Sequence, residues 1–345
     1  MGRTWIRALI TLVALNWVAT CIGHAQGETP LISANAGFIS TTTGGQTNLQ
    51  PILNPVVAAP IGSKLLLEGS YEFQGFVARP TPDSPFDAQY FGSLFYLQMD
   101  YIVNRHLTVV AGRFLTPFNI YNERFSPLWI NPLQNAPLIF AIGTRTSGSS
   151  DGAMVRGVVA ARSGWEWNYT AFFSAGSSVH QFQSGRAFGT RSGVFFPKIR
   201  LEVGASYERF LQDVHNNSSG AYLSWQPNRV PIDVTAEYAH SPQGSGYWVE
   251  TGYQFKQTNP LGPWMHNLIG IVRVQQFFKG VPEPGDALLS TNAQVAEFGF
   301  NYFLPKTVRV NASYGRQFSD AGNFNQWTFG VTKRFTFPAI PARNN

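Results

Sequence analysis

Residues 307–316 read Thr-Val-Arg-Val-Asn-Ala-Ser-Tyr-Gly-Arg, and their alternation decides the fold class. Successive side chains of an extended strand point to opposite sides, so this stretch has two unlike faces. The apolar face holds Val308, Val310, Ala312 and Tyr314, and the polar face holds Arg309, Asn311 and Ser313. Residues 201–210, 231–238 and 327–334 alternate in the same way. The repeated pattern predicts an antiparallel sheet with one apolar and one polar side.

The composition indicates where that sheet lies. Charged residues make up 13% of the 345 residues and aromatic residues 14%, whereas a soluble domain carries about 25% charged residues. The mean hydropathy is only -0.09. This balance is typical of an all-β transmembrane antiparallel β-barrel, whose outer face is apolar and whose inner face is polar. Many aromatic residues argue against disorder, and past residue 25 no run of about 20 apolar residues could form a spanning helix.

Breaks rich in Gly, Pro, Asn and Ser divide the chain into stretches of about ten residues. The expected strands are 64–78, 92–103, 107–115, 152–162, 165–174, 190–196, 199–210, 218–226, 231–240, 246–256, 265–278, 293–304, 307–318 and 326–337. About fourteen strands follow, or sixteen if 31–42 and part of 181–196 contribute. Tight turns are expected at Asn104-Arg105 and Ser163-Gly164, and long loops at 116–150, 175–189 and 279–291.

Aromatic residues recur near the ends of these stretches, as the interface girdles of a barrel require. They are Tyr207, Phe210, Tyr238, Phe255, Phe277, Phe278, Tyr302, Phe303, Tyr314, Phe318, Phe335 and Phe337. A large soluble β-sandwich with an aromatic core is the alternative. It would need a more charged exterior than this chain offers.

Residues 1–25 have the pattern of a secretory signal peptide, with Arg3 and Arg7 before an apolar stretch and small residues before Gln26. An N-terminal membrane anchor is the alternative. Cys21 is the only cysteine and lies in this segment, so cleavage removes it and excludes disulfides. A lipidated Cys21 is a competing interpretation. We expect segment 26–62 to form either a first strand or a plug, residues 63–337 to form the barrel, and 338–345 to be a tail.

The segment 111–129, Ala-Gly-Arg-Phe-Leu-Thr-Pro-Phe-Asn-Ile-Tyr-Asn-Glu-Arg-Phe-Ser-Pro-Leu-Trp, is the most distinctive in the chain. It resembles the outer-membrane porins of the phosphate-selective porin O/P type. The matching residues are Gly112, Arg113, Phe114, Thr116, Pro117, Phe118, Asn122, Glu123, Arg124, Pro127 and Trp129. The resemblance implies a barrel of about sixteen strands, usually trimeric, with a pore for small hydrophilic solutes.

Two features depart from that family. Asn119 stands where its members are expected to have Gly, and the chain ends in a tail rather than at a terminal aromatic residue. Phosphate selectivity would require rings of Lys and Arg along the pore. The inward charges of this chain are mixed, so phosphate specificity does not carry over.

In a pore the functional side chains are charges that face the lumen and set its field. Alternation gives the inward basic candidates Arg113, Arg156, Arg273, Arg309 and Arg334, and the inward acidic candidates Glu68, Glu72, Asp100, Glu202, Glu237, Glu250 and Glu297. An Arg facing lipid near the midplane would cost about 2–4 kcal/mol, which favours the inward assignment. Alternatively, many of these residues pair across neighbouring strands and only hold the barrel together.

The loop 116–150 is the best candidate for a loop folded into the pore, and we predict that Asn122, Glu123 and Arg124 form its constriction. Otherwise these three residues cap a loop turn. Residues 148–152 match the nucleophile pattern G-x-S-x-G, but that motif requires a turn into a helix, and here it precedes a strand. The six histidines are scattered singly, without the spacing of a zinc site.

The sequence therefore predicts an outer-membrane porin of a Gram-negative type of bacterium, exported through its signal peptide and not an enzyme. Its partners would be outer-membrane lipid, small hydrophilic solutes or ions, and two further copies in a homotrimer. No cofactor and no metal is expected. A net charge of +6 without a Lys or Arg block excludes a nucleic-acid surface. A barrel-embedded hydrolase and a plugged structural or adhesive barrel are the alternative functions.

Overall fold

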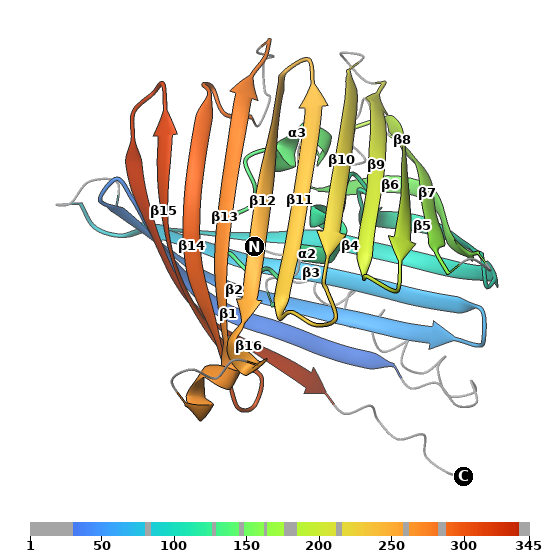
Figure 1. Cartoon of the computed structure of the whole chain (residues 1–345), viewed down its shortest axis with the longest axis horizontal. Coiled ribbons are helices and arrows are strands. Elements are labelled where there is room, and N and C mark those ends of the chain that lie inside the picture. Colours follow the sequence, from blue (N-terminus) through green and yellow to red (C-terminus); the bar gives the residue numbers. More distant parts are fainter. Residues whose placement is uncertain are drawn as a thin grey trace, which may run out of the picture.

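The computed structural model describes residues 30–79, 84–125, 129–144, 148–161, 164–175, 185–211, 216–257, 262–281 and 288–337. These residues form a closed barrel of sixteen antiparallel strands (Figure 1). Each strand pairs with its neighbours in sequence, and β1 pairs with β16 along Ile32–Phe337 through Thr43–Gln326. Closure leaves the sheet without a free edge strand, as a barrel in lipid requires.

The first eight strands are β1 (Leu31–Thr43), β2 (Gln46–Ile61), β3 (Leu65–Ala78), β4 (Asp87–Asn104), β5 (Leu107–Leu115), β6 (Ser149–Ala160), β7 (Glu166–Ser174) and β8 (Ala187–Phe196). The second eight are β9 (Leu201–Phe210), β10 (Asn217–Trp225), β11 (Ile232–Ser241), β12 (Gly244–Gln254), β13 (Leu268–Lys279), β14 (Ala293–Leu304), β15 (Val308–Ser319) and β16 (Phe324–Phe337).

In the described part of the chain, four short helices interrupt the strand order. The helices α2 (Tyr121–Phe125) and α3 (Phe140–Thr144) belong to the connection between β5 and β6. The 3-10 helices η2 (Phe255–Gln257) and η3 (Pro263–Asn267) lie between β12 and β13. Within the described ranges no helix has the length and apolar character to cross a membrane.

The expected strands from 64 to 337 all appear, each within a few residues of its expected ends. The sequence predicts either a first strand or a plug for segment 26–62. In the structure this segment supplies two barrel strands, β1 and β2. The barrel therefore begins at Leu31 rather than at residue 63. The expected signal peptide 1–25 with Cys21, and the tail 338–345, lie outside the described residues.

The outer face is apolar, as the alternation predicts. Large hydrophobic side chains are exposed along it, among them Val272, Val274, Phe298, Phe300 and Phe329. Three of the aromatic residues expected in the girdles instead lie on the inward face. These are Phe210, which is buried, Phe277, which is fully buried, and Phe303, which packs against Trp129. Their position near strand ends could not reveal which face they occupy.

Two prolines interrupt the ladder between β2 and β3. The register joins Ile52 to Gln74 and Val56 to Ser70, but Pro51 and Pro55 are skipped, since proline has no N–H to donate. Pro55 lies opposite Tyr71, whose carbonyl receives instead the side-chain amide of Asn54 at 3.0 Å. The same amide also donates to the Ser70 hydroxyl at 2.9 Å. These prolines explain why β2 does not have the sequence pattern of a strand.

We predict that Asn54→Ala lowers the free energy of unfolding by about 1–3 kcal/mol, because the Tyr71 carbonyl then loses its donor in a buried position. Urea titration of the protein refolded in detergent micelles measures this change. The exposed Gln46→Ala on the same strand is the matched control and should leave the midpoint unchanged. Equal midpoints for both variants would contradict the role of Asn54.

Candidate functional site

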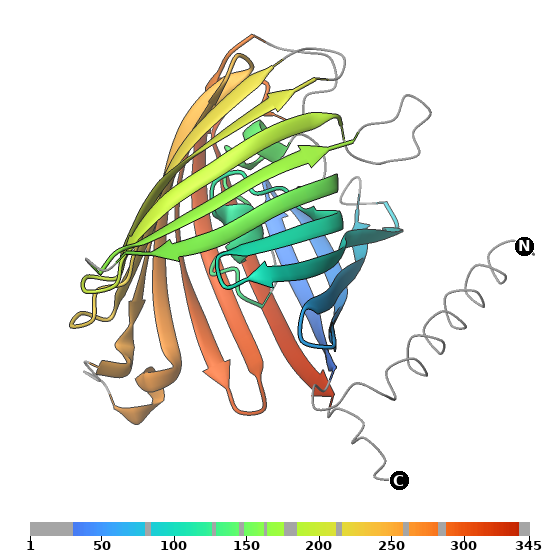
Figure 2. The ribbon, with the colours of Figure 1, turned by 90° about the vertical axis from the view of Figure 1, so that its right-hand side faces the viewer.

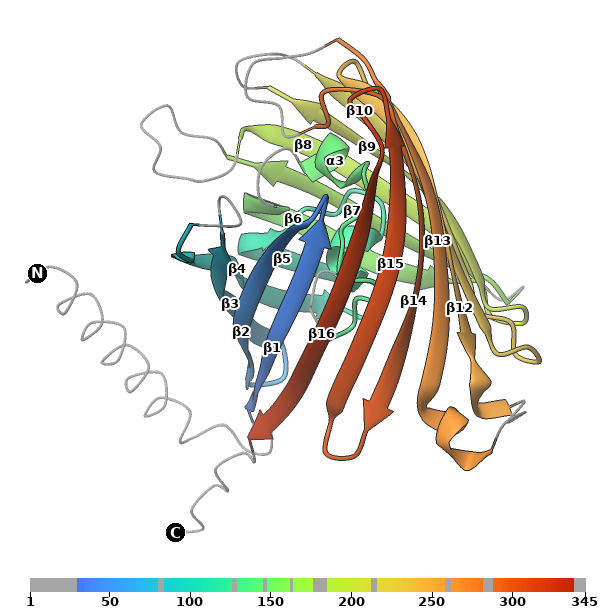
Figure 3. The same cartoon turned by 90° about the vertical axis from the view of Figure 1, so that its left-hand side faces the viewer.

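The described parts of the connection between β5 and β6, residues 116–125 and 129–144, turn into the barrel instead of leaving it. The helix α3 lies inside the ring of strands when the molecule is viewed from the side (Figure 2) and from the opposite side (Figure 3). We call this connection the inward loop. Strands β1–β4 form the wall across the barrel from β9–β12, since the sixteen strands follow one another in order around it.

The chain leaves the sheet at the Gly-Arg-Phe sequence of β5. Gly112 has φ 119°, and a Cβ there would lie 2.5 Å from the carbonyl oxygen of Leu97, so only glycine fits. Phe114 then packs on the inward side, in a buried cluster with Val110, Met154 and Phe172. The structure thus gives a local reason for Gly112 and Phe114, two of the residues that match the porin segment.

Arg113 does not face the lumen. It lies opposite Leu97, an exposed residue of the outer face, and it pairs with Asp151 at 3.0 Å. Because β4 continues beyond the end of β5, its carbonyls at 94 and 95 lack backbone partners there. Arg113 Nε donates to the Leu94 oxygen at 2.8 Å, and Ser149 Oγ to the Phe95 oxygen at 2.6 Å. The expected pore-lining role of Arg113 is therefore wrong: this residue completes the sheet.

Asn122 closes the base of the inward loop. Its side-chain amide donates to the carbonyls of Thr116, at 2.9 Å, and Gly148, at 2.5 Å, and the residue is 2% exposed. Thr116 is further joined to Ser150 by a hydroxyl–hydroxyl hydrogen bond of 2.8 Å. For Asn122 the geometry matches the alternative interpretation, in which it caps a loop turn.

The backbone at Asn119 explains why this chain can have Asn where the porin pattern has Gly. Its φ is 51°, in the left-handed region that favours glycine, and Asn is one of the few other residues that adopt it readily. Its side-chain amide donates to the Tyr238 carbonyl at 3.0 Å, and its backbone N–H donates to Ser206 Oγ at 2.9 Å. Asn at this position therefore keeps the backbone conformation and adds a contact to the wall.

The carboxylate of Glu237 on β11 holds the start of α2. One of its oxygens accepts the backbone N–H groups of Ile120, at 2.8 Å, and Tyr121, at 2.7 Å, and the other accepts the indole N–H of Trp248 at 3.1 Å. All four residues are buried. A buried donor left without an acceptor costs about 1–3 kcal/mol, and this one side chain satisfies three donors, so it is a principal anchor of the inward loop.

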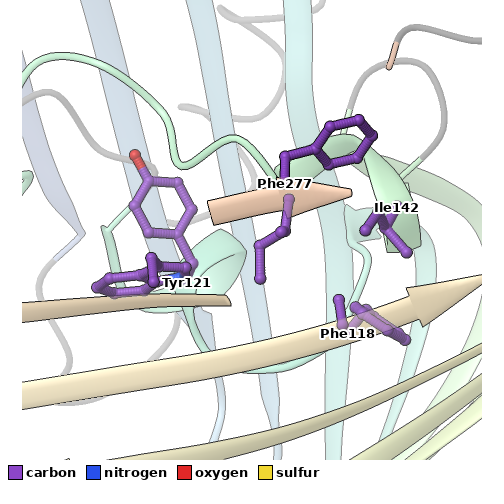
Figure 4. Packing of buried hydrophobic residues seen from close by; sticks show 7 residues of the cluster. Phe118, Tyr121, Ile142 and Phe277 are labelled. Atoms are coloured by element: carbon purple, nitrogen blue, oxygen red, sulfur yellow. The ribbon is translucent and has the colours of Figure 1, made fainter. Parts of the chain in front are cut away.

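Apolar packing supports the same anchor (Figure 4). The buried cluster joins Phe118, Tyr121, Ile139 and Ile142 of the inward loop to the inward-facing wall residues Ala239, Trp248 and Phe277. Burying a large apolar side chain contributes about 1.5–3 kcal/mol. Burial also raises the pKa of Tyr121 to about 12, so its phenol stays protonated; the phenol oxygen accepts the Asn131 amide at 3.0 Å.

Glu123 and Arg124 fasten the loop to the next strands. Glu123 forms an ion pair with Arg191 on β8, and Arg124 forms an ion pair with Glu202 on β9 at 2.7 Å. Glu202 also accepts from Tyr222 at 3.2 Å. Both predicted loop charges are therefore bound to the wall.

The second half of the loop crosses β13–β16. Arg309 donates to the carbonyls of Trp129, at 2.9 Å, and Asn131, at 2.8 Å. Arg273 is fully buried, pairs with Glu250 at 2.6 Å and donates to the Asn135 carbonyl at 2.6 Å. The side chain of Asn135 in turn donates to Glu297 at 3.1 Å. Six of the predicted lumen residues thus hold the loop directly or support its contacts: Glu202, Glu237, Glu250, Arg273, Glu297 and Arg309.

The remaining predicted residues lie on the inward face elsewhere. Gln98 on β4 donates to Glu68, at 3.2 Å, and to Asp100, at 2.9 Å, and Asp100 pairs with Arg156 on β6. Glu72 shares the inward face of β3 with Glu68. Arg334 lies opposite the inward residue Asn35 near the end of β16 and is exposed.

The sequence interpretation missed Arg191, the partner of Glu123. Alternation along β8, which begins at Ala187 rather than at 190, places Arg191 on the inward face with Gly189 and Gly193. Asp151, the partner of Arg113, lies just outside the expected strand 152–162, whereas β6 begins at Ser149 and includes it.

The geometry around the G-x-S-x-G match supports no nucleophile. Gly148 leads directly into β6, and Ser150 is 4% exposed with its hydroxyl bonded to Thr116. Among the described residues, no group of three or more His, Cys, Asp or Glu side chains is placed to hold a metal ion.

We predict that Asn119→Gly lowers the unfolding free energy by about 1–3 kcal/mol through loss of the amide donor to Tyr238, without backbone strain, since glycine adopts the left-handed backbone freely. Asn119→Val should lower it by about 1–2 kcal/mol more than Asn119→Gly, because it loses the same hydrogen bond and a β-branched residue is in addition strained there. Thermal unfolding in detergent, followed by circular dichroism, compares the variants. A valine variant as stable as the glycine variant would contradict the assignment.

Comparisons with known proteins support the architecture. Neither the scan against protein-family models nor the search of curated proteins found a match. Among solved structures, a loop L8 deletion mutant of OmpT, an outer membrane protein of Vibrio cholerae, has 9% identity and a TM-score of 0.58, with 89% of this chain and 100% of that chain covered. The Salmonella typhi OmpF complex with daunomycin has 15% identity, the same TM-score of 0.58, and coverages of 89% and 97%.

An anion-selective porin from Comamonas acidovorans has 10% identity and a TM-score of 0.56, with 89% of this chain and 99% of that chain covered. At these identities the likeness concerns architecture and leaves solute and selectivity aside. This chain is a closed sixteen-stranded antiparallel β-barrel with the fold of outer-membrane porins.

Proposed function

We propose that the protein is an outer-membrane porin through which small hydrophilic solutes or ions diffuse passively. One observation carries the proposal: the inward loop is bonded to the wall of β8–β16, while the wall of β1–β4 keeps a polar inward face. That face includes Ser33, Asn35, Asn54, Ser70 and Gln98. A polar, partly narrowed interior is what a diffusion pore requires.

Within this proposal Glu123 and Arg124 hold α2 against β8 and β9, and α2 narrows the passage from that side. The outer-membrane location and export through the expected signal peptide are part of the proposal, and the porin fold supports the location. The trimeric state and the kinship with the phosphate-selective porin O/P type rest on the segment 111–129 alone. Phosphate preference is not part of the proposal.

Reconstitution in planar bilayers tests the function. The refolded protein should produce discrete conductance steps in KCl, whereas detergent without protein should not. A folded barrel without conductance would overturn the porin proposal. In that case, turnover of lipid or peptide would indicate a hydrolase, and its absence would indicate a plugged structural barrel.

We predict that Glu237→Ala raises the single-channel conductance and its fluctuation, because two backbone N–H groups and an indole N–H lose their acceptor. Each lost buried hydrogen bond costs about 1–3 kcal/mol, enough to let α2 move off the wall. Glu237→Gln is the matched control, since its amide oxygen can still accept, and it should stay closer to the wild type. If both variants conduct like the wild type, Glu237 does not hold the constriction.

A further inference from the structure

The inner charges of the barrel are distributed unequally between the two walls. On the loop side, three ion pairs join residues of opposite sign: Arg124–Glu202, Arg191–Glu123 and Arg273–Glu250. These pairs lie where the inward loop meets β8–β13, so their fields largely cancel over a few ångströms. Glu208, Glu237, Glu297 and Arg309 also lie on the inward face of this wall, but all four are buried, so they contact packed protein atoms rather than the passage.

The opposite wall has a different balance. Mid-strand on the inward faces of β1–β6 stand three carboxylates, Glu68, Glu72 and Asp100, and one guanidinium, Arg156. Arg156 is already paired with Asp100. Two glutamates on one strand, β3, therefore remain as the excess charge of this wall.

The contacts of these two glutamates keep them at the passage. Glu68 receives the Gln98 amide, which also holds Asp100, so three polar groups of β3 and β4 share one small area. Glu72 is half-buried, and within the described residues its carboxylate makes no ion pair. Four residues along a strand separate the two carboxylates by roughly 13 Å, so both lie along the direction of permeation.

Resting on the proposed function, we propose that Glu68 and Glu72 make this pore selective for cations and positively charged solutes over anions. The selectivity originates on the wall that faces the inward loop, because the loop's own charges are paired and the other charges of the wall behind the loop are buried. Each unpaired carboxylate about 10 Å from a monovalent cation in water raises the local cation concentration about twofold. The effect weakens with ionic strength, since the screening length falls from about 30 Å at 0.01 M salt to about 10 Å at 0.1 M.

The reversal potential across a planar bilayer with a KCl gradient tests this inference, because the two ions have nearly equal mobilities in water. The wild type should favour potassium over chloride, more strongly at low than at high mean salt. Because each carboxylate raises the potassium concentration about twofold and lowers that of chloride about twofold, the double variant Glu68→Gln/Glu72→Gln should lower the permeability ratio by up to about sixteenfold at low salt. Asp320→Asn, which removes a charge from the exposed turn between β15 and β16, is the matched control and should leave the ratio unchanged.

The outcomes separate the inference from the function on which it rests. Conducting channels that prefer chloride, or show no preference, would overturn the inference and leave the porin proposal in place. A ratio that falls equally in the control and in the double variant would also overturn it. Absence of any conductance would overturn the proposed function and this inference with it. The wild-type reversal potential decides the sign even if the double variant folds poorly.

Discussion

Closure of the sheet between β1 and β16 is the constraint on which the other features depend. In lipid each unpaired backbone group costs several kcal/mol, so every strand must find two neighbours. Three local features serve this requirement. The Asn54 amide replaces the N–H that Pro55 lacks, and Arg113 and Ser149 supply donors to the β4 carbonyls beyond the end of β5. Each is a side chain that completes a backbone ladder.

Closure also creates an interior that must be partly filled, and the inward loop fills it from one side. The loop is attached by a carboxylate that accepts two backbone N–H groups, by ion pairs to β8 and β9, and by a hydrophobic cluster around Trp248 and Phe277. A buried ion pair contributes little net stability, but removing one partner costs about 3–5 kcal/mol. The pairs therefore fix the position of the loop rather than hold the barrel together.

Much of the barrel follows from the sequence, because a period of two along a strand is visible wherever one face is apolar. The strands from 64 onward, the inward face of most mid-strand charges and the long loop at 116 are all predictable in this way. The strand β2 is not, because its prolines and uncharged residues hide the alternation. The outward face of Arg113 is not predicted either, since it depends on where the loop leaves the wall. Phe277 lies four residues after Arg273 on β13, so alternation does place it inward although its place near a strand end suggests a girdle.

The site is predictable in its members but not in their pairing. Alternation identifies Glu237, Glu250 and Arg273, yet nothing along the chain shows that Glu237 meets the N–H groups of residues 120 and 121. Those contacts join positions more than a hundred residues apart and exist only after the loop has folded inward. The sequence therefore gives the inventory of lumen charges, whereas the structure separates those that hold the loop from those that face the passage.

The account places the passage between the inward loop and the wall of β1–β4. Cys21 is the only natural cysteine. In a protein that lacks Cys21, a single introduced cysteine therefore reports whether a thiol reagent reaches its wall. Gln74→Cys lies on the inward face of β3, and Gln275→Cys lies behind the loop, where its oxygen accepts the Leu138 N–H. A charged thiol reagent should reduce the conductance of the Gln74→Cys channel and leave that of Gln275→Cys unchanged. Reduction in the second channel and not in the first would contradict the account.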